Sequence, residues 1–452
     1  MSGFGCNQTV LLHVPERPRQ RLRDACQGPT DPEAGAILAS PEAAFLEETP
    51  IHSPGDPGLA VYVHIPFCLS RCPYCDFNTY TGMQAWVPSY IRALCREAAQ
   101  VADAAGGSLI ADTVYIGGGT PSILPPGVLL ELMEGLRSAL EVPKQAEMTI
   151  EVNPGDASAA WMAAARQAGF SRLSLGMQSA DARVLTFLGR RHAHADTVAA
   201  VGLARQAGFE NISLDLIYGV PGQSLDSWME TVDQALGFEP DHLSAYALTV
   251  EAGTPLGDWV STGLVSPPDD DLAADMVEWL EERLDRAGFL HYEISNWGRR
   301  LGGDAPSAAR VSQHNLRYWR NQPYLGLGAG AHGYAGGLRY ANAGRIPDYL
   351  TRLGERDRSP RFPLSSAVCQ WRCVEPDEAA RDSMLLGLRL TAWGVERDGF
   401  VARHGLPAWQ ALQPAVDGLI LDGLLEWFDS GRRLRLTRRG RQVGNRVFQA
   451  FV

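Results

Sequence analysis

The 452-residue sequence has no apolar run approaching the roughly 18 residues that a membrane-spanning helix requires. Its first residues also lack the apolar core of a signal peptide. Positive charge is in deficit, because 52 acidic residues exceed 40 basic ones and give a formal net charge of -12. Such a charge argues against nonspecific nucleic-acid binding by the whole molecule. We therefore expect a soluble protein with no nucleic-acid partner and at most peripheral contact with a membrane.

A disulfide framework is also absent. Five of the eight cysteines are scattered without any framework spacing: Cys6, Cys26, Cys95, Cys369 and Cys373. The last two repeat a C-x3-C spacing without a third partner, which we interpret as incidental. This cysteine usage predicts a reducing, cytoplasmic location.

The apolar content of 45% and the charged content of 20% are those of an ordinary globular protein. The length indicates one large domain with a smaller one attached.

The remaining cysteines lie close together in the stretch Tyr62–Asn78, which reads YVHIPFCLSRCPYCDFN. Cys68, Cys72 and Cys75 are spaced C-x3-C-x2-C directly after the apolar run Leu59–Ile65, which is typical of a short buried strand. Three thiolates on one loop can hold three irons of a [4Fe-4S] cluster and leave the fourth iron open, whereas four-cysteine sites close every iron. An open iron can chelate S-adenosylmethionine and pass it an electron.

A zinc site is the main alternative for these three cysteines. Structural zinc usually takes a fourth Cys or His at its own short spacing. His64, which precedes the loop, is a poor candidate for that ligand. The spacing therefore favours the iron–sulfur interpretation.

Short β-rich runs alternate with helical patterns from Leu59 onward. The predicted strands are Leu59–Ile65, Thr113–Ile116, Met148–Val152, Arg172–Leu175, Asn211–Leu216 and His242–Leu248. The predicted helices between them are Val87–Ala104, Pro126–Leu140, Ala157–Ala168, Ala193–Gln206 and Ser224–Gly237. Apolar strands separated by helices of this length indicate parallel βαβ units. Six such units predict an α/β fold with a partial (β/α)6 barrel, whose chemistry lies at the C-terminal ends of the strands.

Glycine-rich or polar residues follow several of these strands. The three glycines of Gly117–Pro121 (GGGTP) allow the backbone to approach a ligand and leave its N–H and C=O groups free to bind. Glu151 and Gln178 end the next two strands, and Asp215 is flanked by apolar residues that would bury it, so it needs a partner. The pair Arg190–Arg191 could supply a cation to a carboxylate. Each feature could instead be a turn or a surface charge, but together they predict one pocket for a nucleoside and an amino acid.

A second polar and aromatic region follows the barrel. A further helix and strand, Leu272–Ala287 and Leu290–Ser295, precede it. Gln313–Trp319 reads QHNLRYW and is followed by the glycine-rich segment Tyr324–Gly337, which we interpret as a flexible loop. Aromatic and histidine side chains beside such a loop suit a planar aromatic ligand. The alternative is an aromatic cluster that closes the open side of the barrel. His332 is a second ligand candidate.

The last part of the chain changes character at about Glu375. Three predicted helices, a hairpin and a last helix follow: Asp377–Leu390, Glu396–His404, Ala408–Asp422, then Leu425–Phe428 with Leu434–Thr437. This order resembles a winged-helix module, and seven arginines lie between Arg432 and Arg446. A docking or substrate-covering domain is favoured over DNA binding, because the rest of the chain is acidic. We predict a flexible extension (1–57), a barrel (58–300), a connector with the QHNLRYW motif (301–374) and a small α+β C-terminal domain (375–452).

These motifs together resemble the coproporphyrinogen-dehydrogenase branch of the radical SAM superfamily. The resemblance covers about residues 59 to 450 and includes YVHIPFC, the cysteine loop, GGGTP, EVNP, the Gly176–Ser179 turn and DLIYGVPGQ. It implies that Cys68, Cys72 and Cys75 bind a [4Fe-4S] cluster. It also implies that these positions contact S-adenosylmethionine: Tyr62, Tyr74, Gly118, Gly119, Thr120, Glu151, Gln178, Arg190 and Asp215.

One position and one motif separate the members of this branch. The oxidative decarboxylases carry a further cysteine two residues after the third, where this chain has Phe77. The sister group with Phe there, and with the HNxxYW motif that His314 begins, comprises the HemW-type heme chaperones. This resemblance implies heme as cargo, His314 as the preferred candidate for its axial ligand, and heme-requiring membrane or respiratory proteins as recipients, and it is compatible with a homodimer. It assigns no catalytic residue. The alternative is an oxygen-independent coproporphyrinogen III dehydrogenase, a radical SAM oxidative decarboxylase.

Overall fold

A partial barrel of parallel strands forms the larger part of the protein. The computed structural model describes residues 58–107, 109–302, 308–354 and 360–452, so the predicted N-terminal extension lies outside the described residues. The six parallel strands are β1 (Leu59–Ile65), β4 (Leu109–Gly118), β6 (Glu147–Val152), β7 (Arg172–Gln178), β8 (Asn211–Tyr218) and β9 (His242–Ala247). They are adjacent in the order β1-β4-β6-β7-β8-β9. Because they are parallel, their C-terminal ends meet at one rim.

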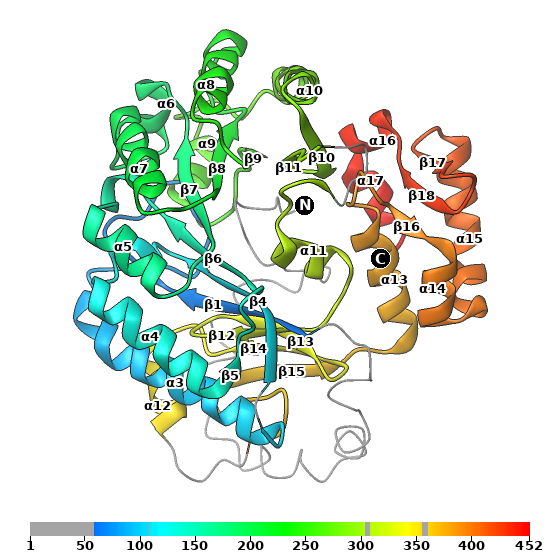
Figure 1. Cartoon of the computed structure of the whole chain (residues 1–452). Coiled ribbons are helices and arrows are strands. Elements are labelled where there is room, and N and C mark those ends of the chain that lie inside the picture. Colours follow the sequence, from blue (N-terminus) through cyan, green and yellow to red (C-terminus); the bar gives the residue numbers. More distant parts are fainter. Residues whose placement is uncertain (1–57, 108, 303–307, 355–359) are drawn as a thin grey trace.

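Helices cover the outside of this barrel (Figure 1). They are α3 (Val87–Ala104), α4 (Pro126–Ala139), α5 (Ala159–Gln167), α6 (Ala182–Phe187), α7 (His194–Gln206), α8 (Leu225–Gly237) and α10 (Asp270–Arg286). Successive side chains of β1 point to opposite faces of the sheet. Val61 and Val63 belong to the apolar core that the helices cover, whereas the intervening Tyr62 packs with Tyr115 of β4 in a separate small cluster. The predicted α/β class and the partial barrel are confirmed, and each predicted strand and helix of the barrel recurs within a few residues.

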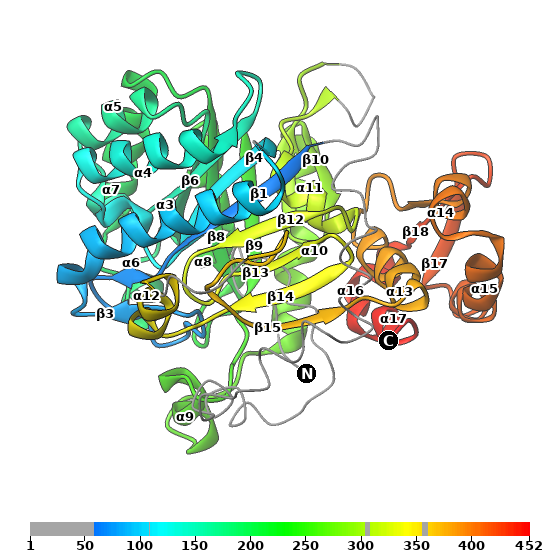
Figure 2. The same cartoon turned by 90° about the horizontal axis from the view of Figure 1, so that it is seen from below.

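An antiparallel extension continues the sheet beyond β1. It consists of β12 (Tyr324–Leu327), β13 (His332–Ala335), β14 (Leu338–Asn342) and β15 (Val368–Cys373), and β12 pairs with β1 in parallel. Figure 2 shows these strands side by side below β1, with α12 (Ile346–Gly354) at one end. The interpretation of Tyr324–Gly337 as a flexible loop was therefore wrong. At the other edge, β10 (Phe289–Glu293) and β11 (Asn296–Arg299) pair antiparallel and join the sheet through β9.

The C-terminal part contains a second apolar core. It packs α13 (Pro376–Gly387), α14 (Arg397–His404) and α15 (Leu406–Leu421) with a three-stranded sheet of β16 (Val395–Glu396), β18 (Arg433–Leu436) and β17 (Leu425–Phe428). Two short helices, α16 (Arg438–Gln442) and α17 (Gly444–Gln449), follow. This arrangement agrees with the expected small α+β domain.

The arginine cluster of this part has partners within the chain. Arg438 approaches Glu278 at 2.7 Å and Arg441 approaches Glu281 at 2.9 Å, both on the acidic helix α10. Arg446 pairs with Asp422 at 2.9 Å. Arg438 and Arg441 therefore attach the C-terminal part to α10 of the barrel, whereas Arg446 is paired within the C-terminal part. In the described residues, no helix is long and apolar enough to cross a membrane.

Glu97 of α3 joins the barrel to the antiparallel extension. Its side chain is 1% exposed and accepts hydrogen bonds from Gly328 N (2.8 Å), Asn342 Nδ2 (2.6 Å) and the hydroxyls of Tyr349 (2.6 Å) and Ser365 (2.9 Å). Burial raises the pKa of Glu97 to about 7, and the four donors oppose that rise. The carboxyl therefore takes up a proton on folding at mildly acidic pH.

Stability is expected to depend on the proton of Glu97. Because its pKa is higher in the folded chain, its contribution is complete below about pH 4.5 and is lost as the pH rises to about 7. The free energy of unfolding should fall by roughly 3 kcal/mol over this window, at about 1.4 kcal/mol per pH unit. Urea unfolding of Glu97→Gln between pH 5 and 8 should lack this part of the slope. The exposed Glu134→Gln should keep the wild-type profile, and identical profiles for all three proteins would refute the assignment.

Candidate functional site

The cysteine loop lies at the C-terminal rim of the barrel. Cys68 ends the short strand β2 (Phe67–Cys68), which pairs with β3 (Tyr80–Thr81) on the far side of the loop. Gln84 donates to the carbonyl of Cys68 at 3.1 Å, and the Leu256 amide of α9 (Pro255–Ser261) donates to the carbonyl of Pro73 at 2.9 Å. The loop is therefore anchored from two sides.

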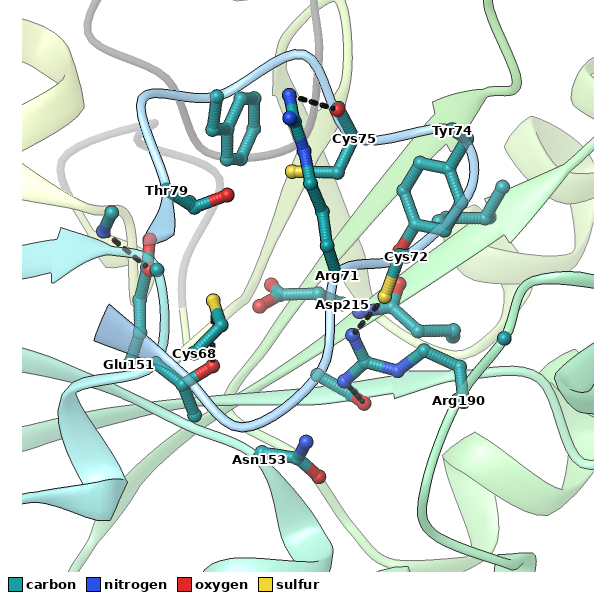
Figure 3. Close-up of a pocket in the computed structure, with 18 of the residues that line it drawn as sticks. Cys68, Arg71, Cys72, Tyr74, Cys75, Thr79, Glu151, Asn153, Arg190 and Asp215 are labelled. Carbon is teal, nitrogen blue, oxygen red and sulfur yellow. Dashed lines mark hydrogen bonds between the residues drawn. The ribbon is translucent and has the colours of Figure 1, made fainter. Parts of the chain in front are cut away.

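The three thiols surround one cavity. All three are free, and Figure 3 shows their sulfur atoms arranged around the same space. In the described residues, no group of three His, Cys, Asp or Glu side chains is close enough to hold a single metal ion. A cubane does not need such closeness, because each thiolate binds a different iron. Burial raises the pKa of Cys75 to about 12 and also raises that of Cys68, so iron must displace protons that the loop otherwise retains.

Most of the predicted site residues line this cavity, which has a volume of about 140 Å³. They are Cys68, Cys72, Tyr74, Cys75, Gly118, Gly119, Thr120, Glu151, Gln178, Arg190 and Asp215. Tyr62 lies apart, buried and hydrogen-bonded to Nδ1 of His64 at 3.0 Å. Sequence reasoning missed several lining residues, among them Asn153, Ser174, Tyr246, Thr249 and Glu251. Their positions just inside or after predicted strands were the available signal.

Two carboxyl groups, those of Glu151 and Asp215, line the cavity. Glu151 accepts from the Tyr115 hydroxyl at 2.9 Å and from Gly118 N at 3.1 Å. Burial and then the charge of Asp215 raise the pKa of Glu151 to about 8. Burial also raises the pKa of Asp215, although Ser174 donates to both of its oxygens, at 3.1 and 2.9 Å. A cationic ligand would relieve this arrangement.

Neighbouring atoms leave no room for a side chain at two glycines of the GGGTP segment. Gly118 has φ +117°, and a Cβ there would lie 2.5 Å from the ring of His64. A Cβ at Gly119 would lie 2.7 Å from the carbonyl oxygen of Phe67. Any side chain would therefore push this segment away from the cysteine loop. The segment brings its backbone into the cavity wall for that reason.

Gln178 and Arg190 supply polar atoms at the opposite wall. Gln178 has φ 62°, a strained value for a residue other than glycine, and its Oε1 is buried without a hydrogen bond to the described residues. Arg190 donates to Sγ of Cys72 at 3.8 Å and to the carbonyl of Gly176 at 3.2 Å (Figure 3). The unbonded Gln178 oxygen and the two carboxyls fit a ligand that carries donors and positive charge, as S-adenosylmethionine does.

His314 lies elsewhere, in the helix α11 (Gln313–Trp319). It is 1% exposed, its Nδ1 is 2.8 Å from Oγ1 of Thr113 and its Nε2 is 2.7 Å from the hydroxyl of Tyr318. Both ring nitrogens are thus engaged, and this geometry does not offer His314 as an axial heme ligand. The assignment of His314 as that ligand stays a prediction, and in this structure its two hydrogen bonds hold α11 against β4.

Comparison with known proteins identifies both parts of the chain. Residues 62–235 match the model of the radical SAM superfamily, and residues 374–443 match that of the HemN C-terminal domain. The former family implies a [4Fe-4S] cluster and S-adenosylmethionine as cofactors.

Curated relatives extend over most of the chain. The heme chaperone HemW of Mycobacterium tuberculosis (strain ATCC 25618 / H37Rv) is 38% identical, covering 88% of this chain and 96% of the relative. HemW of Bacillus subtilis is 35% identical (87% and 99%), and HemW of Escherichia coli K12 is 32% identical (88% and 98%). Among solved structures, coproporphyrinogen III oxidase (HemN) from Escherichia coli superposes with a TM-score of 0.75 at 21% identity, covering 91% of this chain and 94% of that one. That likeness supports the fold.

Proposed function

Because this chain belongs to the HemW family of radical SAM proteins, we propose that it is a heme chaperone, which binds heme as cargo and transfers it to heme-requiring respiratory proteins. The observation that carries this proposal is the 32–38% identity to curated heme chaperones over nearly their whole length. Phe77 supports it, because this side chain lines the cavity where the decarboxylases of the branch carry a further cysteine.

The cofactors of this proposal fit the residues present. Cys68, Cys72 and Cys75 would hold a [4Fe-4S] cluster, and among the residues that the structure describes no fourth cysteine lines the cavity. The cluster supplies an open iron that chelates S-adenosylmethionine and can pass an electron to its sulfonium. The Gly118–Thr120 backbone would bind the methionyl end of S-adenosylmethionine. Glu151 and Asp215 would accept hydrogen bonds from its ammonium or ribose hydroxyls, and each charge-assisted bond contributes about 1.5–3 kcal/mol.

Binding of S-adenosylmethionine is expected to tighten as the pH rises. Glu151 is mostly protonated at pH 7 because its pKa is about 8, and a cationic ligand favours its ionised form. The dissociation constant should therefore fall roughly tenfold between pH 6.5 and 7.5 and level off above about pH 8. Equilibrium binding to the reconstituted protein measures this profile. Glu151→Gln should bind weakly at every pH, and the distant Asp233→Asn should retain the wild-type slope. A flat wild-type profile would show that Glu151 does not respond to the ligand.

An oxygen-independent coproporphyrinogen III dehydrogenase is the second candidate. The observation that favours it is the fold shared with the Escherichia coli oxidase. We expect the anaerobically reconstituted protein to bind about one heme per chain with a defined Soret band. The same preparation should not decarboxylate coproporphyrinogen III, because Phe77 replaces the additional cysteine.

Parallel assays on one preparation decide between the two functions. Heme titration followed by absorbance measures cargo binding, and product chromatography measures decarboxylation. Turnover at about 1 s⁻¹ or faster, typical of enzymes, would overturn the chaperone proposal even if heme also bound. Transfer is tested by mixing heme-loaded protein with an apo-form respiratory heme protein. Heme that stays on the loaded protein would contradict a delivery role.

The cellular setting belongs to the same proposal. We place the protein in the cytoplasm, with peripheral membrane contact during transfer to a recipient. A domain division at about residues 300 and 375 would let the C-terminal part cover the cargo, and a homodimer is compatible with this role. Sedimentation of the reconstituted protein with and without heme measures the oligomeric state.

A further inference from the structure

The turn that leads into β13 is attached to the cysteine loop. Asn78, three residues after Cys75, donates to the carbonyl of Ala329 at 2.9 Å. The hydroxyl of Tyr90 accepts from Ala329 N at 2.8 Å and donates to the carbonyl of His64 at 2.8 Å. A Cβ at Gly330 would lie 2.4 Å from the Asn78 side chain, so this turn and the cluster loop are in direct contact. His332, which follows the turn and begins β13, is therefore held in a fixed position.

The same turn reaches the interior of the barrel. Ala331 packs with Tyr62 and Tyr115, the inward-facing side chains of β1 and β4, in a small separate apolar cluster. The two tyrosine rings are stacked, with centroids 6.2 Å apart. Gly326 of β12 lies opposite this turn, and a Cβ there would overlap the backbone of His332. Gly326 is paired with Tyr62 of β1, so His332 begins β13 on the inner side of the sheet, one strand beyond Gly326.

Most other histidines are committed to hydrogen bonds. Eight histidines lie in the described residues, and six have partners: His64, His192, His242, His291, His314 and His404. His194 packs on Phe238 at the start of α7, outside the barrel. His332 is partly exposed, and neither of its ring nitrogens makes a hydrogen bond within the described part of the chain. Its imidazole is therefore available at the barrel interior.

The electrostatic surroundings keep His332 neutral. Burial, together with the nearby His64 and Arg339, lowers the pKa of His332 to about 4. Neutral imidazole is the form that ligates iron. Its neighbour His64 lies directly against Gly118 in the wall of the cluster cavity.

We infer that His332 is the axial ligand through which this protein holds the iron of its cargo heme. The inference rests on the proposed heme-chaperone function and assigns the axial contact to a histidine whose ring nitrogens make no hydrogen bond in the described residues, whereas both ring nitrogens of His314 do. Because Asn78 ties the turn before His332 to the cysteine loop, heme binding at His332 and occupancy of the cluster should influence each other.

Titration of the full-length, anaerobically reconstituted protein with hemin tests this inference. The wild-type spectrum should show an imidazole-ligated Soret band. His332→Ala should weaken binding at least tenfold and shift that band, and added imidazole should restore the band because it can occupy the vacated position. His332→Met, of similar size, should bind with an altered, thioether-type spectrum. His194→Ala, the matched control, should behave as wild type.

Each outcome separates the inference from the proposed function. If wild type binds hemin and both His332 variants retain its spectrum and affinity, His332 is not the ligand and the chaperone function stands. If wild type does not bind hemin, the proposed function fails first. Cluster content and circular dichroism verify that each variant is folded. A folded His332→Met with an unchanged Soret band would overturn the inference even if the alanine variant did not fold.

Discussion

Replacing Cys72 by alanine is expected to lower the iron retained after anaerobic reconstitution from about four atoms per chain to nearly none. Cys72 is the middle ligand of a loop whose other thiols, Cys68 and Cys75, face the same cavity. Two thiolates leave two irons of a cubane without a protein ligand. Iron and sulfide analysis, together with the charge-transfer absorbance and the EPR signal of the reduced cluster, measure the loss.

The chain provides internal controls for this experiment. Cys369→Ala and Cys95→Ala remove partly buried thiols outside the cavity and should leave iron, sulfide and spectra unchanged. Cys68→Ala and Cys75→Ala should behave as Cys72→Ala does. Wild-type iron content in Cys72→Ala would refute the three-cysteine assignment.

Replacing Arg389 by methionine is expected to destabilise the protein by about 3–5 kcal/mol. Arg389 is 4% exposed, and its charge lowers the pKa of the fully buried Glu293 of β10 against the effect of burial. Its guanidinium also lies 4.4 Å from the ring centroid of Trp319 and 5.3 Å from that of Phe448. The substitution leaves Glu293 as a buried carboxylate without its cation. Urea unfolding measures the difference, which should become smaller as the pH is lowered, because burial raises the pKa of Glu293 and favours its protonated form.

An exposed ion pair provides the matched control. Arg446 and Asp422 pair at 2.9 Å with side chains 65% and 52% exposed, so Arg446→Met should cost at most about 1 kcal/mol. Adding Glu293→Gln to Arg389→Met should recover part of the lost stability. If Arg389→Met and Arg446→Met had equal effects, the buried charge of Arg389 would contribute no more to stability than an exposed ion pair does.

The barrel and most of its cavity could be predicted because their signals are local. An apolar run such as Leu59–Ile65 and a helical period such as that of α3 depend on near neighbours in the chain. Parallel strands then place their C-terminal ends together, so polar residues at those ends must share one rim. For this reason the positions of Glu151, Gln178 and Asp215 around one cavity followed from the sequence.

The antiparallel extension could not be predicted in the same way. Strands β12 to β15 are short, β12 and β13 each contain a glycine, and β12 is stabilised by pairing with β1 far away in the sequence. His314 forms a hydrogen bond with Thr113, which is 201 residues away, and Arg438 and Arg441 form ion pairs with α10. Such pairings leave no periodic signal. Histidine and aromatic residues such as those of Gln313–Trp319 suit a buried hydrogen-bond network as well as a ligand pocket, so their presence alone does not distinguish the two.

The central position of β1 has a consequence for synthesis of the chain on the ribosome. Ala60 pairs with Thr113 on one side and with Tyr324 on the other. At about 5–20 residues per second, roughly 13 to 50 s separate the emergence of β1 from that of its second neighbour. During this interval one edge of β1 has no partner and can pair with another chain. The tether from Asn78 to Ala329 also forms only after that interval, so a nascent chain released before β12 would lack the hydrogen bond that joins its cysteine loop to the turn before β13.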